Sequence, residues 1–317
     1  MIDIFNTTTR PKHELFFRKD DPNDIRLGEI VLFKREDYAN SEIVILGCPQ
    51  DEGVRRNGGR IGAALAPDAI RAQFYKLTNF GISAKIFDIG DMIIQKTLED
   101  THELHTQIAK QILVDGKTIV VLGGGNDVSY ADGRAMAEAF GAENWLGFNI
   151  DAHFDVRADS VRNSGTPYRQ MLEENLLKPQ NFYEIAWQKQ ANSPVYFDYL
   201  MDKGVNLFGF EDIRESEFKF RELLINRLSN GEYQLPIFFG LDVDAVRASD
   251  APGVSAPSPV GLTAEEFIES ATFAGENEQT RIIEFTEMNP AFDIDNRTAK
   301  LVAFAMRGFC AARKQKS

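Results

Sequence analysis

Two short acidic motifs contain the residues best suited to metal chemistry. Asp151, His153 and Asp155 alternate along one segment, and Asp242 and Asp244 alternate along a second. Side chains two residues apart on an extended backbone point the same way, so each motif presents its ligands on one side. If the two rows meet, their negative charges repel one another unless cations lie between them. The spacing therefore predicts a metal site large enough for two divalent ions.

The donor types favour manganese. Carboxylates suit hard or borderline ions such as Mn²⁺, and a single imidazole is compatible with it. Two such ions bridged by a carboxylate would lower the pKa of a water between them and so generate a hydroxide nucleophile. The glycine-rich turn at 123–127 adds Asn126, because its glycines allow the backbone to approach the ions closely. The alternative is that both motifs are unrelated loop carboxylates that cap helices.

Apolar runs predict the elements that position these motifs. Runs suited to buried strands lie at 43–47, 85–89, 118–122, 145–150, 182–187, 205–208, 236–241 and 281–285. Helical patterns separate most of them, notably at 66–77, 218–228 and 264–273. This alternation predicts an α/β fold with a mostly parallel sheet of about eight strands, covered on both faces. We expect an N-terminal arm at 1–40 and a single catalytic domain at 41–317.

Several polar residues lie just past the ends of predicted strands. They are Asn126, Asp151, Asp242 and Glu287. Ligands of parallel sheets bind beyond the carboxyl ends of the strands. Four strand ends are therefore expected to deliver polar groups to one edge, a placement that scattered surface carboxylates would not share.

The composition disfavours some partners. The chain has 317 residues, of which 43% are hydrophobic, and a formal net charge of −13. Such a surface repels phosphate backbones and anionic lipids, so neither nucleic acid nor membrane is an expected partner. No apolar run approaches the roughly 18 residues of a membrane span, and the N-terminus lacks the pattern of a signal peptide. We expect a soluble cytoplasmic protein in which local arginines attract any small anionic substrate.

Four motifs together resemble those of the ureohydrolases, a family that includes arginase, agmatinase and formiminoglutamase. They are G-G-G-N-D at 123–127, D-A-H-F-D at 151–155, L-D-V-D at 241–244 and E-M-N-P at 287–290, and the match runs over about 43–309. The resemblance implies a three-layer α/β/α arginase-like fold and a binuclear Mn²⁺ centre. It also implies that a metal-bridging hydroxide attacks a guanidino or formimino carbon. Relatives commonly form trimers or hexamers, so a homo-oligomer is expected.

Carried over by position, the resemblance assigns roles to the acidic residues. One ion would be held by Asn126, Asp151, Asp155 and Asp242. The other would be held by Asp151, His153, Asp242 and Asp244, with Asp151 and Asp242 as bridges. Glu287 would hold the cationic nitrogen of the substrate by a charge-assisted hydrogen bond.

This chain departs from the family pattern in ways that affect the chemistry. The family usually has His where this chain has Asn126, so one metal site is expected to be weaker. No His follows His153 in the chain. The proton for the leaving nitrogen would therefore come from water relayed by Asp155 or Glu287, or from Tyr168.

Arginines in several loops indicate the substrate. Segments 53–60 and 164–169 resemble the corresponding loops of formiminoglutamase. Arg157 and Arg214 stand where arginases carry a neutral amide and an acid, so their charges favour a substrate with an extra carboxylate. N-formimino-L-glutamate, from histidine degradation, has that carboxylate, and its hydrolysis would give L-glutamate and formamide. The expected substrate-binding residues are Arg60, Arg157, Ser164, Gly165, Thr166, Arg214 and Glu287.

Two other functions are compatible with these residues. The protein could be another ureohydrolase that acts on a guanidino acid, arginase-like or guanidinobutyrase-like. It could also be a metal-depleted, non-catalytic family member, which the Asn126 change would mark. Most arginines could equally be solvated or ion-paired with the excess of acids.

Two histidines outside the motifs are expected to have no role. His102 and His105 are three residues apart rather than the four of the H-E-x-x-H zinc motif. We expect both to be surface side chains on a helix. Cys48, just after the first predicted strand, is expected to be a buried core thiol.

Overall fold

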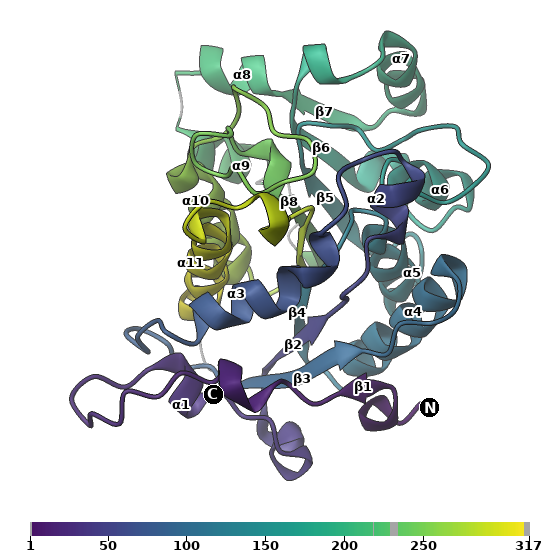
Figure 1. Ribbon diagram of the computed structural model, residues 1–317. Helices are drawn as coiled ribbons and strands as arrows, with labels where there is room; N and C mark the ends of the chain where they lie inside the picture. Colours follow the sequence, from purple (N-terminus) through teal and green to yellow (C-terminus); the bar gives the residue numbers. More distant parts are fainter. Residues whose placement is uncertain (1, 218, 229–233, 314–317) are drawn as a thin grey trace.

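A single nine-stranded sheet forms the centre of the computed structural model, which describes residues 2–217, 219–228 and 234–313 (Figure 1). Its strand order is β1-β3-β2-β4-β9-β8-β5-β6-β7. The strands are β1 (Thr8–Thr9), β2 (Ile43–Gly47), β3 (Ile86–Met92), β4 (Thr118–Leu122), β5 (Leu146–Ile150), β6 (Phe182–Trp187), β7 (Asn206–Gly209), β8 (Ile237–Asp242) and β9 (Thr280–Thr286). All pair in parallel except β1, which runs antiparallel to β3. The mostly parallel sheet predicted from the sequence is confirmed, and β1 is the strand that the sequence did not indicate.

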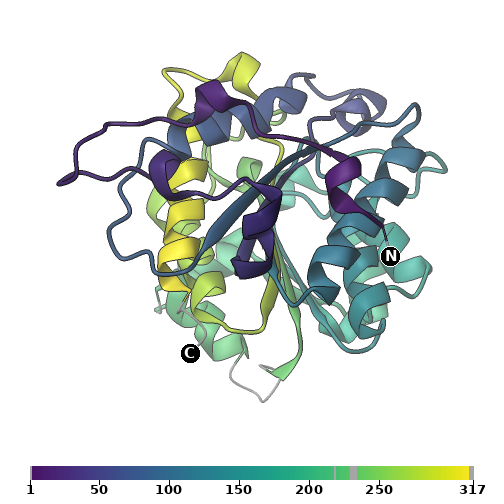
Figure 2. The same cartoon turned by 90° about the horizontal axis from the view of Figure 1, so that it is seen from below.

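Helices cover both faces of the sheet, as Figures 1 and 2 show. On one face lie α3 (Ala66–Phe74), α10 (Ala264–Glu276) and α11 (Arg297–Ala312), and on the other lie α4 (Leu98–Val114), α5 (Val128–Phe140) and α6 (Pro167–Glu173). Successive strand residues enter different cores: Ile119 packs into one and Val120 into the other. The strands are apolar throughout because both of their faces are covered. The three-layer α/β/α arrangement is confirmed.

The remaining helices are short or lie at the rim of the sheet. They are α1 (Leu27–Ile30), α2 (Glu52–Arg56), α7 (Pro194–Lys203), α8 (Phe210–Glu215) and α9 (Phe220–Leu228). The predicted helix at 218–228 corresponds to α9, and its first residue lies outside the described residues. Thr263 caps α10 through a capping box with Glu266, which explains why that helix begins where the sequence predicts. Within the described residues, no helix is long and apolar enough to cross a membrane.

The N-terminal segment packs along the β3 edge of the sheet. Thr8 and Thr9 pair with Met92 and Asp91, and the Phe5 ring packs edge-on against Phe87. Residues 1–40 therefore contribute a strand to the same sheet as the rest of the chain. The division into an arm at 1–40 and a catalytic domain at 41–317 stays a prediction.

The four strands that precede the candidate ligands are neighbours in the sheet. Their order is β4-β9-β8-β5, and all four run in the same direction. Asn126, Glu287, Asp242 and Asp151 follow or end these strands. The fold therefore brings the four predicted polar groups to one edge, as the sequence indicated.

Candidate metal centre

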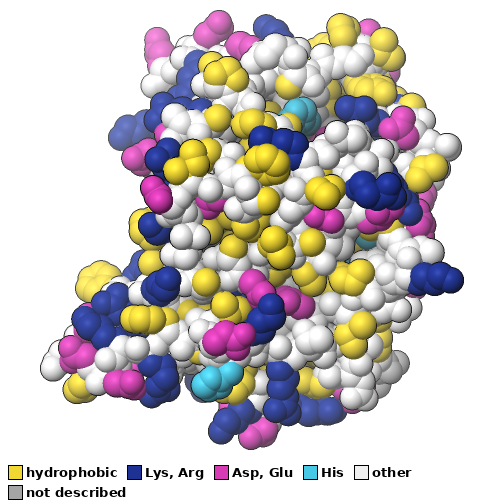
Figure 3. All heavy atoms as spheres, viewed as in Figure 1, with side chains coloured by type: hydrophobic (Ala, Val, Ile, Leu, Met, Phe, Trp, Pro, Cys, Tyr) yellow, Lys and Arg dark blue, Asp and Glu magenta, His cyan; other side chains and the backbone are white. Residues whose placement is uncertain are grey.

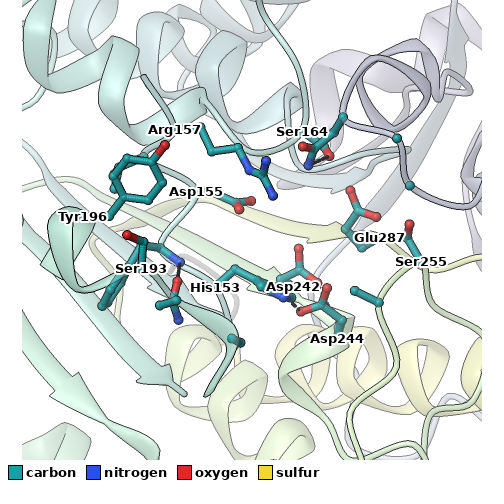
Figure 4. Close-up of a pocket in the computed structure, with 18 residues that line it drawn as sticks. His153, Asp155, Arg157, Ser164, Ser193, Tyr196, Asp242, Asp244, Ser255 and Glu287 are labelled. Atoms are coloured by element: carbon teal, nitrogen blue, oxygen red, sulfur yellow. Dashed lines mark hydrogen bonds and ion pairs between the residues drawn. The ribbon is translucent and has the colours of Figure 1, made fainter. Parts of the chain in front are cut away.

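Two groups of ligand atoms converge at this edge and share Asp151. Figure 4 shows four of the other residues of these groups, His153, Asp155, Asp242 and Asp244. In the first group, ligand atoms of Asp151, His153 and Asp244 all lie within 4.8 Å of one another. In the second, the same holds for Asp151, Asp155 and Asp242. Two triads joined by one carboxylate fit a pair of divalent ions. Asp242, the second predicted bridge, belongs to one of the two triads.

The backbone holds both rows of ligands by the same local turn. His153 N donates to Asp151 Oδ1 at 2.7 Å, and Asp244 N donates to Asp242 Oδ1 at 2.8 Å. Each bond ties a carboxylate to the amide two residues later, a turn that aspartate favours. Asp155 has a φ of +47°, in the left-handed region that non-glycine residues rarely adopt. Such strained residues concentrate at functional sites, where surrounding contacts enforce them.

Burial raises the pKa values of three acids of the centre. Burial, followed by the charge of Asp244, raises the pKa of Asp151 from 3.8 to about 6. Burial also raises the pKa values of Asp155 and Asp242. The Asp244 carboxylate raises the pKa of His153. Asp244 Oδ1 is buried and makes no hydrogen bond among the described residues, but it lies 3.3 Å from His153 Nδ1. The two atoms are close enough to bind one cation together.

These shifts predict that manganese stabilises the protein more as the pH rises. A carboxyl group whose pKa is higher in the folded than in the unfolded protein stabilises the metal-free fold at pH values below its unfolded pKa. This stabilisation is lost as the pH rises through the folded pKa, which is about 6 for Asp151. Cations also compete better once the ligands lose their protons. The increase in Tm on adding Mn²⁺ should therefore be larger at about pH 7.5 than at about pH 5. An equal increase at both values would contradict this assignment of the acids.

The glycine-rich turn places Asn126 in the centre. A Cβ at Gly124 would lie 1.5 Å from the carbonyl oxygen of Gln50, so only glycine fits there. The Asn126 side chain is buried, and its Nδ2 donates to Asp155 Oδ2 at 2.7 Å and to Asp151 Oδ2 at 3.2 Å. The turn therefore places the Asn126 amide next to the carboxylates of Asp151 and Asp155, as the sequence predicted.

Glu287 lies beside the ligands and lines the same cavity. Its Oε1 accepts from Asn126 N at 2.9 Å, and its φ of +61° is again in the left-handed region. Burial, followed by the charge of Asp244, raises its pKa. The other carboxylate oxygen remains available to a cationic group in the cavity.

A cavity of about 450 Å³ opens above the ligands. His153, Asp155, Asp242, Asp244 and Glu287 line its floor (Figure 4). This volume suits a small amino-acid derivative. The pocket therefore combines a cation-binding floor with room for one small substrate.

Arg157 is the predicted arginine that reaches the cavity. Figure 4 shows its guanidinium pointing into the pocket, and it has no hydrogen bond or ion pair among the described residues. Gly165 O accepts from Arg157 N at 2.8 Å, and a Cβ at Gly165 would lie 2.7 Å from Arg157 Cδ. Gly165 therefore leaves space for the arginine stem, while Ser164 lines the cavity itself.

The other predicted arginines are engaged elsewhere. Arg60 donates to the carbonyl oxygens of Val254 and Ser255, and Arg214 forms a two-point ion pair with Glu266. Neither lines the cavity. Many other arginines are ion-paired with acids. Figure 3 shows basic and acidic side chains interspersed on one face. Thr166 is also buried behind the cavity, where its hydroxyl donates to Asn163 O.

Tyr168 lies too deep to give a proton to a substrate. Its side chain is fully buried, its hydroxyl donates to Asn149 Oδ1 at 3.0 Å, and it does not line the cavity. Of the three predicted proton sources, Asp155 and Glu287 are the ones that face the pocket.

Several lining residues were not predicted from the sequence. They are Asn57, Asn192, Ser193, Tyr196 and Ser255, among others. Asn192 also holds the metal loop, since its Oδ1 accepts from Phe154 N and its Nδ2 donates to Ala152 O, both at 2.8 Å. Neutral polar residues of this kind carry no spacing signal, so only the fold identifies them.

The expectation that His102 and His105 are surface side chains is wrong. Both are buried, with 1% and 0% of their surface exposed. His102 Nε2 lies 2.7 Å from Asp127 Oδ2, and His105 Nε2 lies 2.7 Å from Asp132 Oδ1. The face of α4 that carries them packs against α5, where the aspartates satisfy the imidazoles. Cys48 is buried in the core, as expected.

Comparisons with known proteins give consistent relatives. A model of the arginase family matches residues 41–311. A formimidoylglutamase from Staphylococcus aureus is 32% identical over 297 residues, which cover 91% of this chain and 94% of that protein. The structure of Trypanosoma cruzi formiminoglutamase with Mn²⁺ has a TM-score of 0.82 and 33% identity, covering 92% of this chain and all of that one. A Bacillus subtilis formimidoylglutamase has the same fold, with a TM-score of 0.82 and 24% identity, covering 94% of this chain and 96% of that one.

Proposed function

The chain belongs to the arginase family, and from that premise we propose that it hydrolyses the formimino C=N group of N-formimino-L-glutamate to L-glutamate and formamide. One observation carries the proposal: two ligand triads share Asp151 beneath a cavity that the guanidinium of Arg157 enters, and this guanidinium has no ion pair among the described residues. The formimidoylglutamases among its relatives support the same reaction. A guanidino acid is the alternative substrate. The five expected ligands other than Asn126 are all present, which argues against a non-catalytic role.

Two Mn²⁺ ions are the proposed cofactors. Asn126, Asp151, Asp155 and Asp242 would hold one, and Asp151, His153, Asp242 and Asp244 would hold the other. When bound, the ions lower the pKa of water enough to supply a hydroxide nucleophile at neutral pH. Asp244 Oδ1, which lies 3.3 Å from His153 Nδ1, and the shared carboxylate of Asp151 fit this arrangement.

The chain's own acids orient the reacting group and move its proton. Glu287 would bind the cationic formimino group through a charge-assisted hydrogen bond. As the bond between the formimino carbon and the glutamate nitrogen breaks, that nitrogen must gain a proton. Asp155 would relay it from water, because its carboxylate faces the cavity.

The far end of the substrate carries the carboxylates. Arg157 would bind one of them through two parallel hydrogen bonds, a geometry that guanidinium groups favour. Ser164 would add a hydroxyl from the adjacent loop, and Gly165 keeps the arginine stem in place. The roles of Arg60, Thr166 and Arg214 would be indirect, through the loops that they hold.

We also propose a cytoplasmic location and a homo-oligomer, trimeric or hexameric. Both cysteines, Cys48 and Cys310, are free and buried, which is compatible with a reducing compartment. Light scattering of the purified protein would measure the oligomer directly, and a monomer would refute this part.

The decisive assay uses metal-stripped protein with and without added Mn²⁺. We expect formamide and L-glutamate from N-formimino-L-glutamate only when Mn²⁺ is present. Arginine, agmatine and guanidinobutyrate serve as alternative substrates in parallel, with urea as the measured product. Urea release without formamide release would replace the proposal with a guanidino-acid hydrolase.

Replacing Asn126 by histidine is expected to strengthen one metal site. Imidazole is a stronger ligand than an amide oxygen, so Mn²⁺ should bind Asn126→His at that site about tenfold more tightly, roughly 1.4 kcal/mol. The remaining ligands are unchanged, so kcat/KM should change less than about tenfold. Calorimetric titration of metal-stripped protein and steady-state kinetics measure the two effects. Weaker binding by the variant would show that position 126 is not a ligand.

A further inference from the structure

The hydrogen bonds around the Asn126 amide contain a mismatch. Its Oδ1 accepts from Ser129 Oγ at 2.6 Å and from Thr286 Oγ1 at 3.2 Å. Its Nδ2 donates to Asp155 and Asp151 on the other side. In this orientation the amide presents N–H groups, which cannot bind a cation, to the metal centre.

Each hydroxyl on the far side also contacts a carboxylate. Ser129 Oγ lies 2.7 Å from Glu284 Oε2, and Thr286 Oγ1 lies 3.4 Å from Asp242 Oδ2. A hydroxyl has one hydrogen, yet each of these two stands between an amide oxygen and a carboxylate oxygen. Burial raises the pKa of Glu284, so a proton on that acid can serve the Ser129 contact. When a cation binds and Asp242 is ionised, the Thr286 contacts still lack one hydrogen.

Half a turn of the amide about its last side-chain bond removes the mismatch at both hydroxyls. Nδ2 then donates one hydrogen to Ser129 and one to Thr286, and each hydroxyl donates its own hydrogen to its carboxylate. Asn126 Oδ1 then faces the carboxylate oxygens of Asp151 and Asp155. These oxygens repel one another unless a cation lies between them. The turned orientation therefore satisfies the surrounding groups and requires a bound ion.

We propose that Ser129 and Thr286 are positioning residues that turn the amide oxygen of Asn126 into the metal centre when a cation binds. The inference rests on the metal centre of the proposed function and deepens it. Glu284 anchors Ser129 from behind, and all of these side chains are buried. Without a cation, the same amide donates to Asp151 and Asp155 and keeps their carboxylates together.

This arrangement explains how an amide can replace a stronger ligand. An amide oxygen binds a cation less strongly than an imidazole, so its orientation has to be fixed in advance. When the hydroxyls of Ser129 and Thr286 donate to carboxylates, each can accept one of the two hydrogens of the Asn126 amide nitrogen. The amide oxygen in the same position would have no hydrogen to accept. The surrounding residues thus select the ligand orientation.

The test compares Ser129→Ala with the parent protein, both stripped of metal and titrated with Mn²⁺ in a calorimeter. We expect one of the two sites to bind Mn²⁺ about tenfold more weakly, as for other groups that orient metal ligands. Ser270→Ala is the matched control, because Ser270 is also buried and helical but donates only to Glu266 O on α10. The metal-free Tm of both variants is measured in parallel, so that a loss of fold stability is distinguished from a loss of Mn²⁺ affinity.

Thr286→Val provides a second, independent variant, because it keeps the side-chain shape and removes the other hydroxyl. It should also weaken Mn²⁺ binding. If Ser129→Ala does not fold, the Mn²⁺ affinity of Thr286→Val tests the inference alone. Parental affinity in both variants, or a fall in metal-free Tm without weaker Mn²⁺ binding, would overturn the inference. A parent protein that binds no Mn²⁺ would instead refute the proposed function itself.

Discussion

Asp242→Asn is expected to lose nearly all hydrolysis of N-formimino-L-glutamate. The substitution keeps the side-chain size and an oxygen for the Asp244 amide, but it removes the charge that would bridge the two ions. Several kcal/mol of lost charge stabilisation correspond to a fall in kcat on the order of a thousandfold. Mn²⁺ binding, measured as ions per chain after dialysis, should fall from two toward one.

Asp250→Asn is the matched control for this experiment. Asp250 lies on the loop that follows Asp244, pairs with Arg247 and accepts from Ala264 N at the start of α10. Its loss should lower Tm slightly and leave both Mn²⁺ ions and the activity in place. Asp242→Asn with near-parental kcat and two bound ions would remove Asp242 from the centre.

The strands and the ligand motifs could be predicted because their signals are local. An apolar run of five or six residues predicts a covered strand, and the bounds of β2, β4 and β6 agree with the prediction residue by residue. The ligands directly follow strands or lie two residues apart, so the parallel sheet brings them to one edge. By contrast, β1 has two residues and no alternation of its own, and its pairing with β3 depends on where the arm lies.

Partners distant in the sequence could not be predicted. Arg214 was expected to meet the substrate, yet its partner is Glu266, which lies 52 residues further along the chain. His102 and His105 become buried only because α4 packs on α5, and the sequence does not state which helices are neighbours. The sequence did contain one indication that the two histidines share an environment, since His102 and His105 lie one turn apart on the same face of a helix.

Arg157→Ala is expected to raise KM for N-formimino-L-glutamate by about ten- to a hundredfold, because a hydrogen-bonded ion pair contributes roughly 1.5–3 kcal/mol. The guanidinium lies at the cavity without a partner among the described residues, so it is free to bind a carboxylate. In the proposed binding mode it holds a carboxylate rather than the reacting carbon, so it should bind ground state and transition state alike. Steady-state kinetics should therefore show kcat within a few-fold of the parent value, roughly 1 kcal/mol at most.

Two further arginine variants make this result specific. Arg157→Lys keeps the charge but not the two parallel donors, so its KM should fall between those of the parent and Arg157→Ala. Arg214→Ala tests the other arginine predicted from the sequence, and its KM should stay near the parental value because Glu266 already holds that guanidinium. If Arg214→Ala raised KM and Arg157→Ala did not, the carboxylate would bind on the α8 side of the pocket. The substrate would then lie across the metal centre in the opposite direction.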